Sequence, residues 1–303
     1  MDQHLRVFAM VVEKGSFSRA AEELHMTQPA VSQYIKLLEQ TYGEQLLDRS
    51  NKYVRLNKAG EIVYYHAKEI LGLYTKMQRL LDDLANRATG HLSIGASYTF
   101  GEYVLPHFIA RLHEQFPLIK PSIVIGNSKE IAELVEGHQL DVGIIEGELQ
   151  NAHLSIEAFS EDLMYVVASA SHRLAQQTKE VDLSALEQET WIIRELGSGT
   201  RAATETIFQT LSIAPADIME FGSTQLIKES VESGLGLTFL SHLAIRKEVS
   251  MGLLKVIPLK ETPFKRNFSI VLRTSFKTKA LEVFIDLLKK HPAISTVMKK
   301  HEA

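Results

Sequence analysis

Four polar side chains near the N-terminus are of the types, and at the spacing, that could read the edges of DNA bases. Gln28, Ser32, Gln33 and Lys36 lie in the segment TQPAVSQYIKLLE at intervals of four, one and three residues. On a helix, residues separated in this way share one face. A glutamine amide can bond adenine at two points, a serine hydroxyl can reach bases or phosphates, and a lysine can contact guanine or phosphate. The pattern favours a helix that lies in the major groove of double-stranded DNA.

The segment that carries these side chains also has the signals of a helix with one buried face. Thr27 is predicted to be its N-cap, and Pro29 falls in the first turn, where a missing N–H costs little. The other face carries a predicted buried stripe, which consists of Val31, Ile35 and Leu38. The helix is therefore expected to present its polar side to a partner.

Two more helices are predicted before this one, and a basic hairpin after it. Ser18 is expected to cap the helix SRAAEEL, and the first helix has an apolar stripe made of Leu5, Phe8, Ala9 and Val12. The segment LLDRSNKYVRLNKAG alternates like a two-stranded wing. Its basic side chains, placed to touch phosphates or the minor groove, include Arg49, Lys52 and Arg55. Residues 1–58 thus read as a winged helix-turn-helix domain, and the alternative is a small helical domain with a solvated polar face.

A long helix without a breaker follows over residues 59–88. Its apolar heptad positions are Val63, Ile70, Met77 and Leu84, with His66, Leu73 and Leu80 between them. One helix cannot bury such a seam alone, so we expect it to pair with a second subunit; the alternative is packing against the chain's own core. His66 is expected to be packed or hydrogen bonded.

The remaining chain, residues 89–303, alternates apolar strands with amphipathic helices, which predicts parallel α/β structure covered on both faces. The hinge is placed at ATGH. The strand–helix pattern occurs twice, so two subdomains are expected, and EDLMYVVAS and RNFSIVLRT are the natural crossover strands. The predicted subdomains comprise residues 91–161 with 268–303, and residues 162–267.

Ligands of open α/β sheets bind beyond the carboxyl ends of strands, at helix N-termini, where free N–H groups favour an anion. In the first subdomain this rule nominates Ser97, Tyr98, Thr99, Asn127, Ser128 and Glu146. In the second subdomain it nominates Glu195, Ser198, Gly199, Thr200, Arg201 and Thr224. The prediction is a small anionic effector, such as a carboxylate or an inorganic oxyanion. Ordinary capping and turn roles are the alternative, and Arg201 could equally pair with Glu195 or Glu205.

The composition and the absence of several motifs exclude a number of functions. The chain has 303 residues, a net charge of −4 and no cysteine, which excludes disulfides and thiol catalysis and fits a cytoplasmic protein. No membrane span or signal peptide is expected. GLGLTF and GSGTRA fail the dinucleotide fingerprint, and no phosphate-binding loop, nucleophile elbow or zincin motif occurs. We therefore predict no catalytic residue, metal or cofactor. The alternative class is a small-molecule binding protein without a DNA function.

The chain resembles the LysR-type transcriptional regulators. The resemblance is carried by SFSRAAEEL, TQPAVSQYIKLLE and LLDRS in that order, followed by VRLNKAG, and it extends along essentially the whole chain. It implies an α/β fold with an N-terminal winged helix-turn-helix, a linker helix that pairs subunits antiparallel, and a two-subdomain effector domain like that of periplasmic binding proteins. It also implies a homodimer or homotetramer, with RNA polymerase as a further partner.

The resemblance assigns roles to particular residues as well. Base reading is implied for Gln28, Pro29, Ser32, Gln33 and Lys36, and entry into the minor groove for Lys52 on the wing. Many members have arginine at the position of Gln33, so a preference shifted away from guanine is expected. The segments GASYTFGEYVLP and RELGSGTR resemble the subgroup linked to sulfur assimilation and cysteine biosynthesis, which implies an effector such as sulfite, sulfate or a cysteine precursor; a short organic acid fits equally well.

Overall fold

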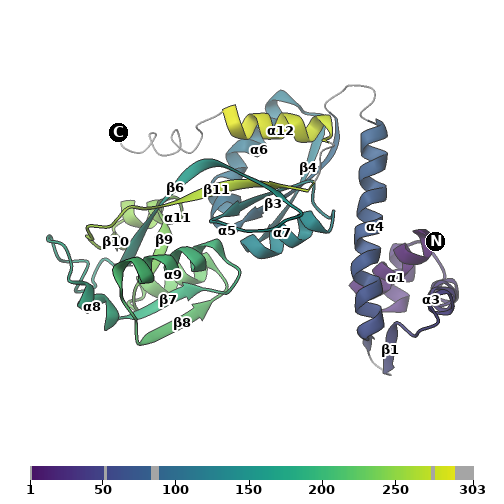
Figure 1. The fold of residues 1–303 in the computed structure, drawn as a ribbon, viewed down its shortest axis with the longest axis horizontal. Helices are drawn as coiled ribbons and strands as arrows, with labels where there is room; N and C mark the ends of the chain where they lie inside the picture. The colour runs from purple at the N-terminus through teal and green to yellow at the C-terminus, as the bar shows by residue number, and fades with distance from the viewer. Residues whose placement is uncertain (1, 51–52, 83–88, 274–276, 291–303) are drawn as a thin grey trace. The chain divides into compact units, whose positions relative to one another are not determined.

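The computed structural model describes residues 2–50, 53–82, 89–273 and 277–290 (Figure 1). The chain divides into two compact units, the first made mainly of residues 1–84 and the second of most of the chain beyond them. None of the described helices is long and apolar enough to cross a membrane.

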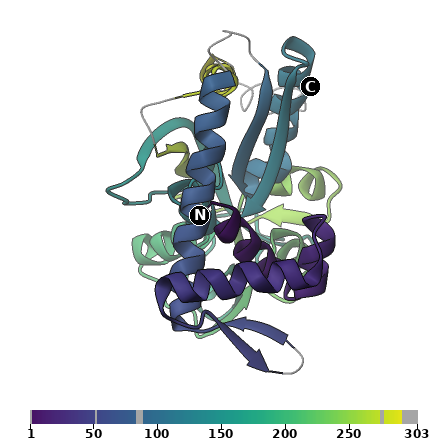
Figure 2. The same ribbon diagram turned by 90° about the vertical axis from the view of Figure 1, so that its right-hand side faces the viewer.

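The N-terminal unit packs three short helices, a two-stranded wing and a long helix around one core. Its elements are α1 (Asp2–Lys14), α2 (Phe17–Glu23), α3 (Gln28–Tyr42), β1 (Leu47–Ser50), β2 (Tyr53–Leu56) and α4 (Lys58–Asp82). Val31, Ile35 and Leu38 of α3 are fully buried together with Phe8 of α1 and Ala20 of α2, which confirms the predicted stripe. Figure 2 shows the β1–β2 wing projecting from the same end of this unit as α3.

The second helix begins earlier than predicted. Its N-cap is Ser16, whose hydroxyl accepts a hydrogen bond from the Arg19 N–H at 3.4 Å. Ser18 lies inside α2 and is exposed, so the prediction that Ser18 is the cap is wrong. The hydroxyl that accepts from a free N–H of the first turn must belong to the residue just before the helix. Ser16 occupies that position, whereas Ser18 does not.

The long helix α4 exposes most of its predicted seam. Ile70, Leu73 and Met77 all lie exposed, whereas Val63 packs against the N-terminal core. Leu84 lies outside the described residues. The large exposed apolar side chains of α4 are Ile62, Tyr65, Ile70, Leu73, Tyr74, Met77 and Leu81. Among the described residues of α4, the N-terminal core therefore covers only the first turns of the seam.

His66 departs from the packed position expected within that seam. Its side chain is 62% exposed, and Nδ1 lies 3.0 Å from a carboxylate oxygen of Glu69, one turn further along α4. The hydrogen-bonded alternative is confirmed and the packed one is wrong for the single chain.

The C-terminal unit contains a seven-stranded sheet that runs through both of its subdomains. The sheet path is β10–β6–β11–β5–β3–β4, and β9 pairs with β6. Its strands are β3 (Gly90–Ser97), β4 (Ile119–Gly126), β5 (Val142–Glu146), β6 (Ser155–Ser169), β9 (Thr238–Ser241), β10 (Leu254–Val256) and β11 (Phe264–Leu272). The strands β3, β4 and β5 are parallel, as predicted. The long strands β6 and β11 pair antiparallel along their length, which confirms them as the crossover strands.

The sheet is thus mixed, which corrects the expectation of a purely parallel one. A crossover strand that leaves the first subdomain and one that returns to it must run in opposite directions. When they lie side by side, as β6 and β11 do, they can only pair antiparallel.

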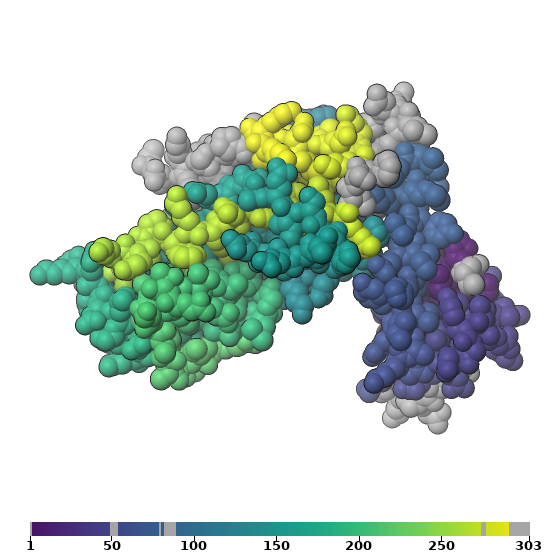
Figure 3. All heavy atoms as spheres, in the orientation of Figure 1, coloured from purple at the N-terminus to yellow at the C-terminus, as the bar shows by residue number. Residues whose placement is uncertain are grey.

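Helices cover the sheet of the first subdomain on its two faces. They are α5 (Tyr98–Tyr103), α6 (Leu105–Gln115), α7 (Ser128–Glu136) and α12 (Lys279–Lys290). The space-filling view shows α12, in yellow, covering one side of this subdomain (Figure 3), and Phe284 of α12 is buried against Ile94 and Phe108. The segment GEYVLPHFIARLHEQF is divided between the end of α5 and the whole of α6, although its sequence could be taken for one helix. Pro106, in the first turn of α6, has no N–H to continue α5.

The second subdomain has its own core around Trp191 and Phe239. Its remaining elements are α8 (Leu183–Glu187), β7 (Thr190–Arg194), α9 (Gly199–Leu211), β8 (Asp217–Phe221), α10 (Thr224–Glu232) and α11 (His242–Ser250). The strands β7 and β8 form a separate parallel pair, with a single bridge from Trp191 to Leu237. The elements α8, α11 and β10 were not predicted from the sequence. The carboxyl ends of β7 and β8 lead directly into α9 and α10.

Candidate nucleic-acid interface and effector site

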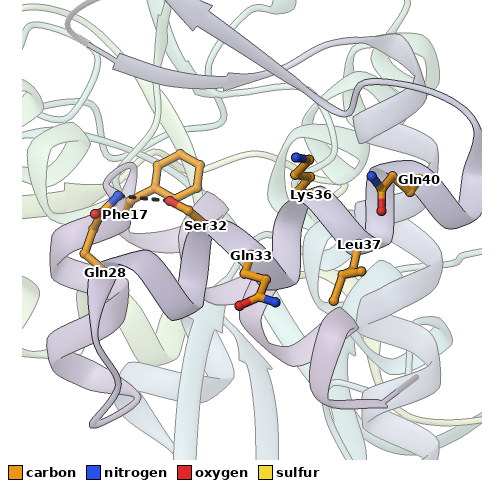
Figure 4. A pocket seen from close by; sticks show the side chains of 7 residues that line it. All are labelled: Phe17, Gln28, Ser32, Gln33, Lys36, Leu37 and Gln40. Atoms are coloured by element: carbon orange, nitrogen blue, oxygen red, sulfur yellow. Dashed lines mark hydrogen bonds between the residues drawn. The ribbon is translucent and has the colours of Figure 1, made fainter.

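The outward face of α3 forms a groove lined mostly by polar side chains (Figure 4). Gln28, Ser32, Gln33 and Lys36, which were predicted to read bases, all line it. Thr27 occupies the N-cap position with extended backbone, although its side chain makes no capping hydrogen bond. The helix geometry therefore brings these four predicted side chains to one exposed surface.

Two of these side chains are hydrogen bonded to each other. The Gln28 amide donates a hydrogen bond from Nε2 to the Ser32 hydroxyl at 2.9 Å, across one helical turn (Figure 4). This contact joins the two side chains along one face of the helix. Pro29 occupies the first turn of α3 as expected, where its missing N–H leaves no intrahelical hydrogen bond unmade.

Three residues of the groove were not singled out from the sequence. They are Phe17, Leu37 and Gln40. Leu37 and Gln40 lie four and seven residues after Gln33, so helical spacing alone could have found them. Phe17 belongs to α2, and its place beside α3 depends on how the two helices cross.

The wing carries one described basic side chain. The register of the hairpin pairs Asp48 with Arg55, and Arg55 is exposed. Arg49 lies in β1, but its side chain and the whole of Lys52 fall outside the described part of the structure. A wing with exposed cations is suited to contact phosphates.

Glu146, at the end of β5, places its carboxylate where the two subdomains meet. Its Oε1 accepts hydrogen bonds from the backbone N–H groups of Thr99 at 2.7 Å and Phe100 at 3.3 Å, in the first turn of α5. Its Oε2 accepts one from the Thr200 hydroxyl, at the start of α9, at 3.3 Å. A Cβ on Gly199 would collide with the Glu146 carbonyl oxygen, so the two backbones are in close contact. The Glu146 carboxylate therefore occupies the start of α5, where the sequence had led us to expect an anionic ligand.

Arg266 of β11 completes this buried cluster. Its NH1 lies 2.9 Å from Glu146 Oε2, and its Nε donates to Asp162 Oδ2 at 2.8 Å. Its other N–H groups donate to the hydroxyls of Thr200 at 3.0 Å and Thr99 at 3.1 Å. Sequence reasoning missed Arg266; the available signal was an arginine that directly precedes the mostly apolar second half of a strand.

The two carboxyl groups beside Arg266 respond to it differently. Burial disfavours the charge of Glu146, but the Arg266 guanidinium and the Thr99 and Phe100 N–H groups outweigh burial and hold the pKa of Glu146 below its ordinary value. At Asp162 burial dominates, so the pKa of that carboxyl is raised despite Arg266. One cation thus stabilises two buried acids unequally.

A second buried arginine lies at the end of β7. Arg194 is 1% exposed, and it donates from Nε and NH2 to the Glu195 carboxylate at 2.7 and 2.8 Å. Its NH1 donates to the Thr224 hydroxyl at 3.0 Å, and its guanidinium lies 4.4 Å from the centre of the Tyr98 ring. The Asn127 amide donates to Glu195 at 3.4 Å. Predicted residues of both subdomains therefore meet around Arg194, which sequence reasoning also missed.

The charge of Glu195 is stabilised at this place. Burial alone would raise the pKa of the carboxyl, but the hydrogen bonds from Arg194 lower it. Since a quarter of the Glu195 side chain remains exposed, it can face a ligand in a way that buried Glu146 cannot.

Other predicted residues have structural partners. The Ser128 hydroxyl donates to the carbonyl of Glu146 at 3.1 Å and accepts from its N–H at 3.2 Å. Ser198 caps α9 by accepting from the Thr200 N–H at 3.2 Å. The buried Ser97 hydroxyl favours the ionised form of Glu146, but it has no hydrogen bond of ordinary geometry among the described residues.

Arg201 follows the structural alternative. It donates to Glu205 at 2.6 Å, one turn along α9, and to Glu220 of β8 at 2.9 Å. The pairing with Glu205 was one of the two that the sequence left open. Within the described ranges, no group of three or more His, Asp or Glu side chains could hold a metal ion.

Two family models match separate parts of the chain. Residues 3–61 match the model of the bacterial regulatory helix-turn-helix proteins of the lysR family, and residues 85–293 match the LysR substrate binding domain. The HTH-type transcriptional regulator CysL of Bacillus subtilis is 36% identical over 288 residues, which cover 95% of this chain and 96% of CysL.

Solved structures of full-length regulators show the same fold. A full-length OxyR variant from Pseudomonas aeruginosa is 27% identical with a TM-score of 0.70, and the match covers 97% of this chain and 96% of OxyR. Full-length CbnR complexed with its target DNA is 19% identical with a TM-score of 0.71, covering 96% of this chain and 99% of CbnR. With its helix-turn-helix and its two-subdomain α/β effector domain, the chain belongs to the LysR family of transcriptional regulators.

Proposed function

We propose that this regulator binds operator DNA through α3, responds to a small anionic effector held between its two subdomains, and controls genes of sulfur metabolism. The observation that carries the DNA-binding part is the groove on α3, where Gln28, Ser32, Gln33 and Lys36 share one exposed face. In this reading Thr27 and Pro29 position the helix start. The basic residues of the wing that would contact the DNA backbone or minor groove are Arg49, Lys52 and Arg55.

The active form is proposed to be a homodimer joined through α4. Its exposed apolar side chains, such as Leu73 and Met77, would be buried against the same helix of a second subunit. The two helix-turn-helix domains of such a dimer then match two half-sites separated by whole turns of DNA, about 34 Å per turn. Assembly of two dimers into a tetramer and contact with RNA polymerase follow from the family resemblance. We place the protein in the cytoplasm, with its DNA, and assign it no catalytic role.

The effector is proposed to bind near Arg194, where residues of both subdomains converge. Tyr98, Asn127, Glu195 and Thr224 already meet there. The starts of α9 and α10 contribute backbone N–H groups that favour an anion. The wider set of proposed effector residues is Ser97, Tyr98, Thr99, Asn127, Ser128, Glu146, Glu195, Ser198, Gly199, Thr200, Arg201 and Thr224. Within this set, the cluster at Glu146 and Thr200 would sense how closely the subdomains approach.

The sulfur assignment is supported by two observations. The segments GASYTFGEYVLP and RELGSGTR resemble the sulfur-assimilation subgroup, and CysL of Bacillus subtilis is similar over nearly the full length. Sulfite, sulfate and small cysteine precursors are therefore the first ligands to test, with short organic acids as comparison.

Two measurements test the proposal. A gel-shift assay with DNA from upstream of the protein's own gene should show sequence-selective binding that weakens as salt rises. Binding that does not distinguish this DNA from a scrambled duplex would overturn the regulator function. A thermal-shift screen should find an anion that raises the melting temperature, because a ligand of the native state alone stabilises it. A response only to organic acids would overturn the sulfur assignment and leave DNA binding intact.

A further inference from the structure

One aliphatic side chain lies among the polar residues of the DNA-reading groove. Leu37 is 41% exposed and lines the groove on α3. The other residues that α3 contributes to this groove are Gln28, Ser32, Gln33, Lys36 and Gln40, all of which can make hydrogen bonds. Leu37 offers only apolar surface.

Leu37 is not part of the buried stripe of α3. Its neighbour Leu38 is fully buried and supplies the third position of the α3 stripe, whereas Leu37 points out of the core. Exposed single leucines are common on protein surfaces and by themselves indicate nothing. The position of Leu37 within the reading face is what makes its exposure informative.

Leu37 follows Gln33 by one helical turn, and Figure 4 shows the two side chains pointing to the same side of α3. At 1.5 Å per residue, four residues advance about 6 Å along the helix. That distance is roughly two base-pair steps. A helix that brings Gln33 to one base edge therefore brings Leu37 to a base pair close by.

The major groove presents one apolar group, the C5-methyl group of thymine. A leucine in contact with it buries a methyl group from water on both partners. We propose that Leu37 is a specificity-determining residue that packs against the methyl group of a thymine within about two base pairs of the base read by Gln33. This inference rests on the proposed binding of DNA by α3, and it adds a preference for thymine that no hydrogen-bonding side chain of the groove supplies.

The test removes one methyl group at a time from the DNA. A tight-binding duplex is first selected from random sequences with the full-length protein. Each thymine in it is then replaced singly by uracil, which keeps every hydrogen bond and lacks only the methyl group. Dissociation constants are measured by fluorescence anisotropy at one salt concentration for the wild type, Leu37→Ala and the matched control Gln33→Ala.

The wild type should bind about fourfold more weakly when uracil replaces the contacted thymine, the value expected for one buried methyl group. Leu37→Ala should lose this sensitivity at that position, and Gln33→Ala should retain it. Leu37→Asn serves as a second variant and should behave like Leu37→Ala.

Three results would overturn the inference. The first is a wild type indifferent to every thymine-to-uracil change, a measurement that needs no variant. The second is a uracil penalty that persists unchanged in both Leu37 variants, in which case another residue makes the contact. The third is failure to select any preferred duplex, which would overturn the proposed DNA recognition as well; in the first two cases that recognition stands.

Discussion

At the scale of single residues, Arg266 holds together the buried polar cluster of the effector domain. It lies buried between Glu146 and Asp162 and also donates to the hydroxyls of Thr99 and Thr200. Breaking a buried ion pair by removing one partner is costly, because the remaining charge stays buried without compensation.

Replacing this arginine should therefore destabilise the domain strongly. We expect Arg266→Met to lower the free energy of unfolding by about 3–5 kcal/mol, measured by urea denaturation. The matched control is Lys265→Met on the same strand, which removes an exposed pair with Glu161 and should change stability by less than about 1 kcal/mol. Equal effects of the two changes would contradict the role of the buried cluster.

The lowered pKa of Glu146 leads us to expect that the stability of the protein depends on pH. Its pKa in the folded protein is lowered, so the folded state favours its charge; this contribution is present above the unfolded value of about 4.3 and is lost as pH falls through the folded pKa. Glu146→Gln should thus flatten the acid side of the stability–pH curve below about pH 5. Urea denaturation across that range measures it, and Glu161→Gln, which removes an exposed carboxylate, should leave the slope almost unchanged.

Replacing Gln33 tests whether the groove of α3 reads bases. A bidentate contact to adenine contributes about 1–3 kcal/mol of discrimination, so Gln33→Ala should reduce the preference for the selected duplex over single-base variants by that amount. Arg55→Ala on the wing should instead weaken binding to all duplexes alike and lessen its salt dependence. Competition binding at two salt concentrations separates these effects. A uniform loss with Gln33→Ala would contradict base reading.

At the scale of elements, α4 makes the clearest prediction. Its exposed residues Leu73 and Met77 lie one turn apart on one side of the helix. Placing charge there should prevent burial against a second copy, so Leu73→Asp with Met77→Asp should shift the protein to monomer in sedimentation velocity. Thr75→Asp, an exposed change on the other side of α4, should leave the dimer intact. A dimer that survives the double change would require a different interface.

Some helices and strands could be predicted from the sequence, and the contacts between distant strands could not. The buried stripe of α3 was predictable because its apolar positions repeat within one helix, and the β6 and β11 crossovers because their apolar runs are long. The break between α5 and α6 was signalled by Pro106. The pairing of Arg266 with Asp162 was not predictable, because it joins residues 104 positions apart and exists only once β6 and β11 lie side by side. Local patterns thus located the predicted residues, while long-range strand pairing decided which of them meet.

At the scale of the whole molecule, the effector and the DNA are expected to influence each other. A ligand can shift DNA binding only by its different affinity for the two arrangements of the protein, and linkage requires the reverse effect to be equal. An effector that tightens operator binding about fivefold should itself bind about fivefold more tightly in the presence of operator. Titration calorimetry with and without operator measures both, and Thr200→Ala, which alters the contact with Glu146, should reduce the coupling while operator affinity without effector persists.

The bond between Gln28 and Ser32 has a consequence for how the protein searches a genome. While the regulator lies on unrelated sequence, this hydrogen bond gives the Gln28 Nε2 donor and the Ser32 hydroxyl oxygen a partner within α3. Only a matching site offers replacement partners to both side chains at once. We therefore expect the exchange of this internal hydrogen bond for contacts with bases to add to the preference for a matching site.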